Sequence, residues 1–151
     1  MPTHFIGSRA EMRTLDTFIK LTRCTNSLFA RLSERNTLGG MTPSQFAVLE
    51  ALYHLGSLTQ GEVSTKVLKS GSNMTTVIDN LERDGLVRRE RDAKDRRVIN
   101  VHLTEAGSGK VDAVLPKHVG ALVEEFSVLS ASEQLTLGEL CKKLGKGQES
   151  E

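Results

Sequence analysis

The side chains best suited to do chemistry in this sequence are a run of cations between residues 88 and 97. Six Lys and Arg residues fall there against three carboxylates: Arg88, Arg89, Arg91, Lys94, Arg96 and Arg97. A local stripe of cations binds phosphate groups, because each neutralised phosphate releases a counterion. On charge alone, a solvated hairpin of mixed charge is the more common interpretation of such a run. The secondary-structure elements predicted around the run must therefore decide between a phosphate-binding surface and a solvated hairpin.

Other reactive groups give weaker signals. Cys24 and Cys141 lie far apart and form no CxxC pair, which argues against a disulfide framework and a zinc site. The four histidines are scattered and show no ligand spacing, so we expect no metal. The sequence also lacks a glycine-rich phosphate loop and a GxSxG elbow, so we expect neither an enzyme nor a cofactor.

Helix starts are marked by capping boxes, in which a Ser or Thr is followed three residues later by Glu or Gln. These signals predict helices over about 9–35, 43–55, 60–68 and 131–144. The second helix is expected to bury Phe46, Leu49, Leu52 and Tyr53. A further helix is predicted from about Ser72 to Gly85, with apolar residues at i, i+3, i+4 and i+7 on one face.

The hydrophobic period changes to two after Gly85. Segments 86–91 and 98–103 read as two strands joined by 92–97, which predicts a charged β-hairpin. Thr104 then caps a long helix that contains Pro116, and this proline is expected to bend or interrupt it.

This order of elements is that of a winged helix-turn-helix, a mainly α fold with a small β-hairpin wing (α+β). The apolar side of the 72–85 helix completes a small core and leaves its polar side free for the major groove. The candidate base-contacting residues on that side are Ser72, Asn73, Thr75, Thr76 and Asn80. The hairpin then lies beside the DNA backbone or in the adjacent minor groove, where arginine is favoured.

Several segments together resemble the MarR family of winged helix-turn-helix transcriptional regulators. They are Thr42–Leu49, Ser72–Val87, Asp95-Arg96-Arg97 and Leu103–Gly107, and the match spans roughly 10–145. The resemblance implies a single MarR-like domain over 1–151. It comprises a DNA-binding lobe at 42–103 and a helical dimerisation lobe at 9–38 and 104–145. The terminal helices carry long apolar stripes without a local core, and a two-fold homodimer would bury them.

The resemblance also implies roles for the hairpin residues. Arg97 would enter the minor groove and Asp95 would steady it by a salt bridge. Three neighbouring cations are further candidates for contact with double-stranded DNA: Arg89, Lys94 and Arg96. The implied function is a repressor that binds a near-palindromic operator and is released by a small phenolic or aromatic-acid effector, whose binding residues the sequence does not identify.

Two alternatives remain open at this point. One is a winged-helix protein-interaction module without DNA binding. The other is a thiol-based redox sensor at Cys24, whose thiolate Lys20 and Arg23 would stabilise. The tyrosines that accompany the sensing cysteine of peroxide-responsive relatives are missing, so a buried or dimer-interface cysteine is favoured. With no signal peptide and no apolar run of about 18 residues, a cytoplasmic protein without membrane association is expected.

Overall fold

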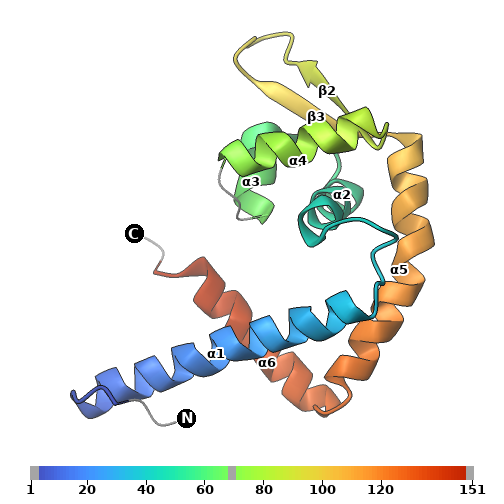
Figure 1. Cartoon of the computed structure of the whole chain (residues 1–151). Coiled ribbons are helices and arrows are strands. Elements are labelled where there is room, and N and C mark those ends of the chain that lie inside the picture. The colour runs from blue at the N-terminus through green and yellow to red at the C-terminus, as the bar shows by residue number, and fades with distance from the viewer. Residues whose placement is uncertain (1–3, 68–70, 149–151) are drawn as a thin grey trace. The chain divides into compact units, whose positions relative to one another are not determined.

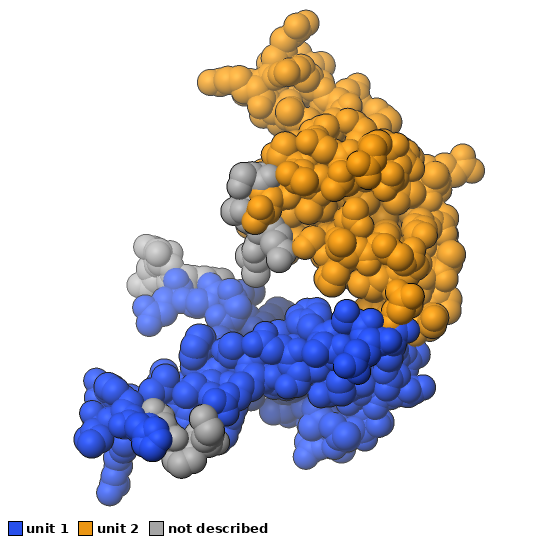
Figure 2. All heavy atoms as spheres, in the orientation of Figure 1, with its two compact units in different colours: residues 1–35, 120–151 blue, residues 36–119 orange. Residues whose placement is uncertain are grey.

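The computed structural model describes residues 4–67 and 71–148, and for residues 71 and 72 it describes the backbone alone. The chain divides into two compact units (Figure 2). One comprises residues 36–119, and the other comprises residues 1–35 together with 120–151. The predicted DNA-binding lobe at 42–103 lies within the first unit.

The 36–119 unit contains helices and a small sheet (Figure 1). Their order is α2 (Pro43–Leu55), β1 (Leu58–Thr59), α3 (Gln60–Val67), α4 (Gly71–Arg83), β2 (Val87–Arg91), β3 (Ile99–Leu103) and most of α5 (Glu105–Phe126). The sheet order is β1-β3-β2 and every pairing is antiparallel. The hairpin was predicted, but β1 was not, because two residues are too short to show a hydrophobic period.

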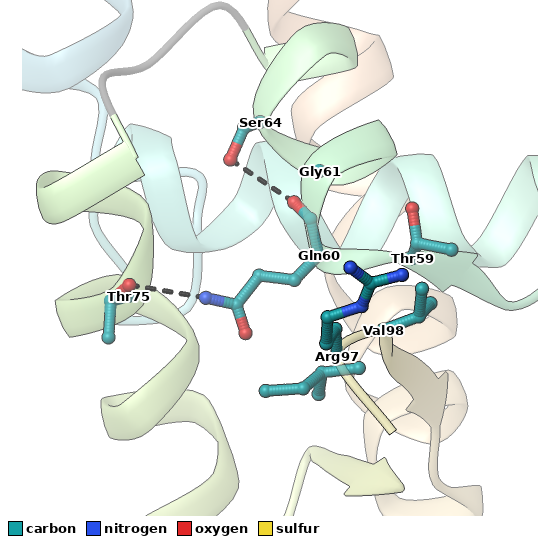
Figure 3. A pocket seen from close by; sticks show the side chains of 8 residues that line it. Thr59, Gln60, Gly61, Ser64, Thr75, Arg97 and Val98 are labelled. Atoms are coloured by element: carbon teal, nitrogen blue, oxygen red, sulfur yellow. Dashed lines mark hydrogen bonds between the residues drawn. The ribbon is translucent and has the colours of Figure 1, made fainter. Parts of the chain in front are cut away.

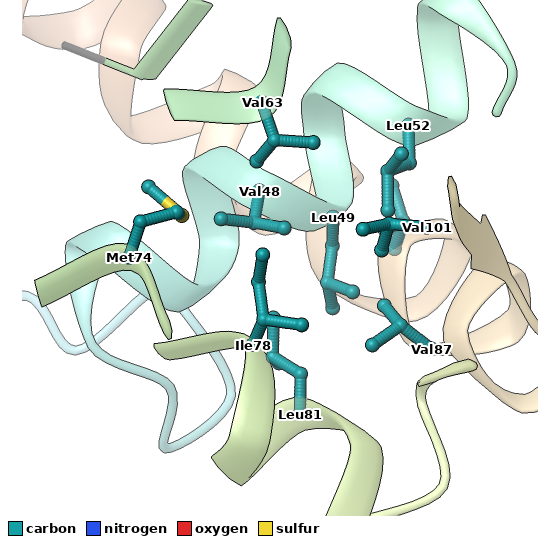
Figure 4. Close-up of a cluster of buried hydrophobic side chains, with 10 residues drawn as sticks. Val48, Leu49, Leu52, Val63, Met74, Ile78, Leu81, Val87 and Val101 are labelled. Atoms are coloured by element: carbon teal, nitrogen blue, oxygen red, sulfur yellow. The ribbon is translucent and has the colours of Figure 1, made fainter. Parts of the chain in front are cut away.

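The core of this unit is one cluster to which α2, α3, α4, the sheet and α5 all contribute (Figure 4). Its members are Val48, Leu49, Leu52, Val63, Met74, Ile78, Leu81, Val87, Val101 and Val111. Truncation of a buried Leu or Ile to Ala costs about 2–5 kcal/mol, so the cluster firmly fixes the orientation of α4. Because the apolar face of α4 lies against α2 and α3, its polar face must point outward.

The prediction for Tyr53 is wrong. Its side chain is exposed, and its hydroxyl donates a hydrogen bond of 2.6 Å to Asp112 Oδ1 on α5. This hydrogen bond and the charge of the carboxylate raise the pKa of Tyr53. Tyrosine is amphipathic, so its ring can pack at a boundary while its hydroxyl reaches a polar partner.

Val48 of α2 is fully buried, although the predicted apolar face of this helix did not include it.

The start of α5 packs directly against the entry to β2. The hydroxyl of Thr104 donates to Gly85 O at 2.7 Å and accepts from Gly107 N at 3.0 Å. Thr104 N also donates to Leu86 O at 3.1 Å. A Cβ on Gly107 would collide with the Leu86 carbonyl oxygen. The Leu-Thr-x-x-Gly pattern therefore holds α5 to the wing sheet.

Pro116 does not interrupt α5, which runs as one helix from Glu105 to Phe126. A proline inside a helix removes one hydrogen bond and costs about 3 kcal/mol. Burial of Val111, Val114 and Ala121 on the same helix offsets that cost. Among the described residues, no helix combines the length and apolar character needed to cross a membrane.

The other unit contains α1 (Arg9–Glu34), the end of α5 and α6 (Ala131–Lys146). Capping boxes at Ser8 and Ser130 begin α1 and α6, as predicted. Arg31 and Arg35 join α1 to the end of α5 through Glu125, at 2.6 and 3.1 Å. The hydrogen bond from Arg31 and the neighbouring charges lower the pKa of Glu125.

Candidate nucleic-acid interface

The outward face of α4 carries the polar residues that the sequence assigned to base contact. Asn73, Thr75 and Thr76 are exposed, and Asn80 is half-buried. Ser72 lies in the first turn of α4, and its side chain is outside the part of the chain that the structure describes. Because Met74, Ile78 and Leu81 are fully buried on the opposite face, this polar surface has a fixed orientation.

A residue that the sequence analysis missed contacts this face. Gln60, the first residue of α3, donates from Nε2 to Thr75 Oγ1 at 3.1 Å. It lines a hollow of about 520 Å³ bordered by α3, α4 and the end of the wing loop (Figure 3). The other lining residues are Thr59, Gly61, Ser64, Thr75, Arg97, Val98 and Ile99. The capping box around Gln60 marked only the start of a helix, and its partner Thr75 lies 15 residues away, so no sequence signal pointed to this contact.

The wing loop between β2 and β3 is organised by Asp92. Its carboxylate accepts hydrogen bonds from Lys94 N at 2.8 Å, Asp95 N at 3.1 Å and Asn100 Nδ2 at 3.2 Å. The two backbone donors and then the Asn100 amide lower the pKa of Asp92. Three hydrogen bonds to one carboxylate give the loop a defined conformation in the free protein, so less ordering is needed when it binds a ligand.

Arg97 and Asp95 form an ion pair at the end of this loop. Asp95 Oδ1 accepts from Arg97 N at 3.1 Å and from its Nε at 3.2 Å, while Nη2 lies 3.4 Å from Oδ2. The Arg97 side chain is nevertheless 91% exposed. The carboxylate therefore orients an arginine that remains accessible to an anion. Lys94 and Arg96 are exposed beside it.

Arg89 has a different environment. Its guanidinium lies between two carboxylates of α4, 2.5 Å from Asp79 and 3.0 Å from Glu82, and its side chain is only 25% exposed. Its backbone N–H also donates to Glu82 at 2.8 Å. The hydrogen bond between the two side chains raises the pKa of Arg89 and lowers the pKa of Glu82. The structure places Arg89 as a link between α4 and β2, less accessible to phosphate than Arg97.

The thiols and histidines form no site in the described chain. Cys24 and Cys141 are both free and exposed. Burial within the single chain, one of the two environments expected for Cys24, is therefore wrong, and an interface position stays a prediction. No cluster of three or more His, Cys, Asp or Glu suited to a metal ion occurs among the described residues.

Comparison with known proteins identifies a matching family and similar transcriptional regulators. The model of the MarR family matches residues 39–98. The HTH-type transcriptional regulator MhqR of Bacillus subtilis is 34% identical over 133 residues, which is 88% of this chain and 92% of that protein. The HTH-type transcriptional repressor MdtR of the same organism is 33% identical, covering 74% of this chain and 72% of MdtR.

A solved structure shares the fold at lower identity. NadR in complex with 4-hydroxyphenylacetate aligns with a TM-score of 0.77 at 20% identity, covering 98% of this chain and all of that one (100%). The winged helix-turn-helix with additional N- and C-terminal helices is thus an established architecture.

Proposed function

The chain belongs to the MarR family of winged helix-turn-helix transcriptional regulators, and we propose that it is a homodimeric repressor of a near-palindromic operator. Its family and relatives are regulators of transcription rather than enzymes. In the proposed complex, α4 contacts base edges in the major groove and the wing reaches the adjacent minor groove.

The observation that carries this proposal is the exposed Arg97 held by Asp95. A minor groove concentrates negative potential and attracts inserted arginine. An arginine ordered before binding loses less conformational entropy on insertion than a free one. A wing that served only to bind another protein would have no need of an exposed cation ordered in this way. The ion pair therefore favours DNA over the protein-interaction alternative.

Dimerisation is supported by the apolar side chains left exposed in the 1–35 and 120–151 unit. They include Phe18, Phe29, Val123, Leu135 and Leu140. These residues recur along three helices, as they would on faces that pack against a second copy. A two-fold dimer would also present two copies of α4, which matches a palindromic site with half-sites about one helical turn apart.

We propose a small phenolic or aromatic acid as the effector. MdtR is a repressor, and NadR binds 4-hydroxyphenylacetate, which is an acid of this class. A ligand that binds the DNA-free state more tightly than the bound state must release the operator by mass action. The residues that would bind it are not assigned.

The test is a binding titration with DNA selected from a random library by the purified protein. The expected result is a conserved, near-palindromic sequence bound at least 10³-fold more tightly than random DNA, within the range of specific regulators. Recovery of no common sequence, or equal affinity for selected and random duplexes, would contradict the proposal and favour the protein-interaction module. Adding 4-hydroxyphenylacetate to the complex tests the effector class.

A further inference from the structure

Gln60 is held in place by the cap of its own helix. Thr59 and Glu62 form reciprocal hydrogen bonds, with Thr59 N donating to Glu62 Oε2 at 2.7 Å and Glu62 N to Thr59 Oγ1 at 3.1 Å. This capping box fixes the first turn of α3, from which Gln60 projects. The position of Gln60 relative to α4 is therefore set by the capped first turn of α3.

From that position, the Gln60 side chain spans the space between α3 and α4. Its Nε2 reaches Thr75 Oγ1 at 3.1 Å (Figure 3). Thr75 lies on the exposed polar face of α4 between Asn73 and Thr76. A threonine hydroxyl rotates with χ1, so a hydrogen bond from a neighbouring helix restricts where that hydroxyl points.

The other end of the same amide has no partner in the part of the chain that the structure describes. Gln60 Oε1 is shielded from solvent and accepts no hydrogen bond from the described residues. A shielded acceptor without a partner destabilises the folded state, because its lost hydration is not replaced. Turning the amide over would exchange its two ends and leave a donor unpaired instead. A side chain kept at this cost is poorly explained by stability alone.

Gln60 and Thr75 also line the hollow that Arg97 borders. The hollow thus lies where the polar face of α4 meets the end of the wing. A DNA strand contacted by both elements would pass over it. The Gln60 contact therefore lies at the proposed interface and not in the core.

We propose that Gln60 is a specificity-determining positioning residue that acts through Thr75. It holds the Thr75 hydroxyl toward one base pair, and Thr75 reads that base pair in the major groove. This inference rests on the proposed DNA-binding function. It assigns to α3 a part in base selection beyond the packing of α4.

The experiment compares Gln60→Met, Thr75→Val and the double variant with wild type. Methionine keeps the length and helix propensity of glutamine but has no donor for Thr75, and valine keeps the shape of threonine. The duplex selected by wild type is changed one base pair at a time, and the affinity of each variant is measured for every duplex. Ser64→Ala is the control, because Ser64 lines the same hollow but bonds only the backbone of its own helix.

Both single variants should lose discrimination at the same base pair, by about 5- to 150-fold, the range for one base contact. The double variant should lose little more, because Gln60 acts only through Thr75. The salt dependence should not change, since no charge is removed. Additive losses, losses at different base pairs, or full discrimination by Gln60→Met would overturn the inference. If wild type selects no sequence, the proposed function itself fails, which is a separate outcome.

Discussion

At the scale of single residues, the wing is defined by two carboxylates with different tasks. Asp92 accepts two hydrogen bonds from the loop and one from Asn100 of β3, whereas Asp95 orients the exposed Arg97. A generic basic surface gains nothing from a carboxylate beside its arginine. The local geometry therefore separates an ordered groove-binding wing from a patch of unspecific positive charge.

Replacing Arg97 by Ala should weaken operator binding and lower the slope of log affinity against log salt by about one per subunit, or about two per dimer. Asp95→Ala should also weaken binding, although it removes a negative charge. Arg97 would then be ordered only on binding, at a cost of about 0.5–1.5 kcal/mol. Titration of both single variants and the double variant at two salt concentrations measures this.

The double variant supplies the control for the wing. It should bind about as weakly as Arg97→Ala, because Asp95 acts only through the arginine. Tighter binding by Asp95→Ala would show instead that the wing contributes simple electrostatic attraction.

Gly107 tests the contact between α5 and the wing sheet. Gly107→Ala should lower the free energy of unfolding by about 1–3 kcal/mol, because the new methyl group meets the Leu86 carbonyl and the backbone must shift. Gly109→Ala is the matched control on the same helix. Apart from its chain neighbours and the backbone of its own helix, no described atom lies within 4 Å of its added Cβ, so it should stabilise by about 0.5–1 kcal/mol. Equal effects in chemical denaturation would contradict the packing described.

At the scale of elements, the recognition helix and the wing are joined by charge as well as by the core. Glu82 and Asp79 of α4 hold Arg89 of β2, so the angle between helix and wing depends on this link. The sequence interpretation counted Arg89 among the DNA contacts because it lies in the cationic run. Its partners Glu82 and Asp79 lie seven and ten residues away in the sequence, and they become neighbours of Arg89 only when β2 folds back on α4.

The Glu82–Arg89 link should be visible in acid. The pKa of Glu82 is lowered in the folded chain, so its contribution to stability is present above the unfolded pKa, near 4.5, and is lost as the pH falls through the folded value. Glu82→Gln should cost about 1 kcal/mol at neutral pH, since the pair is partly exposed. It should lose less stability than wild type between about pH 5 and 3.

Unfolding free energies measured across that range check the prediction. Glu105→Gln is a suitable control, since it removes a carboxylate from the same unit without touching Arg89. If Glu82→Gln follows the wild-type acid profile, the link contributes nothing to stability.

At the scale of the whole molecule, the exposed apolar faces of α1 and α6 predict a dimer. Phe18 is 62% and Leu140 60% exposed in the single chain. Phe18→Glu and Leu140→Glu should each shift the protein toward monomer, because they place a charge in an apolar contact. Analytical ultracentrifugation at micromolar concentration measures the change, and operator affinity should fall with it.

The control introduces the same charge on the same helix at an exposed polar position. Thr17→Glu, whose hydroxyl bonds only the backbone of α1, should leave the dimer intact. A wild-type protein that sediments as a monomer would refute the prediction without reference to any variant.

The sequence alone determined the order of the helices in the described chain, the approximate bounds of most of them, and the wing strands. Capping boxes and hydrophobic periodicity are local signals, and the residues that carry them lie within a few positions of each other. The Asp95–Arg97 pair was expected from the resemblance to the MarR family, and it joins residues only two positions apart.

Tertiary structure decided the rest. Strand β1, the Tyr53–Asp112 hydrogen bond, the carboxylate partners of Arg89 and the Gln60–Thr75 contact all join residues that are brought together only by folding. The outcome at Pro116 was also decided by tertiary structure. The sequence shows the local cost of a proline inside a helix, but burial of other residues of α5 offsets that cost and the helix continues. Local propensity predicts elements, but long-range packing decides which polar groups meet, and so which residues form the interface.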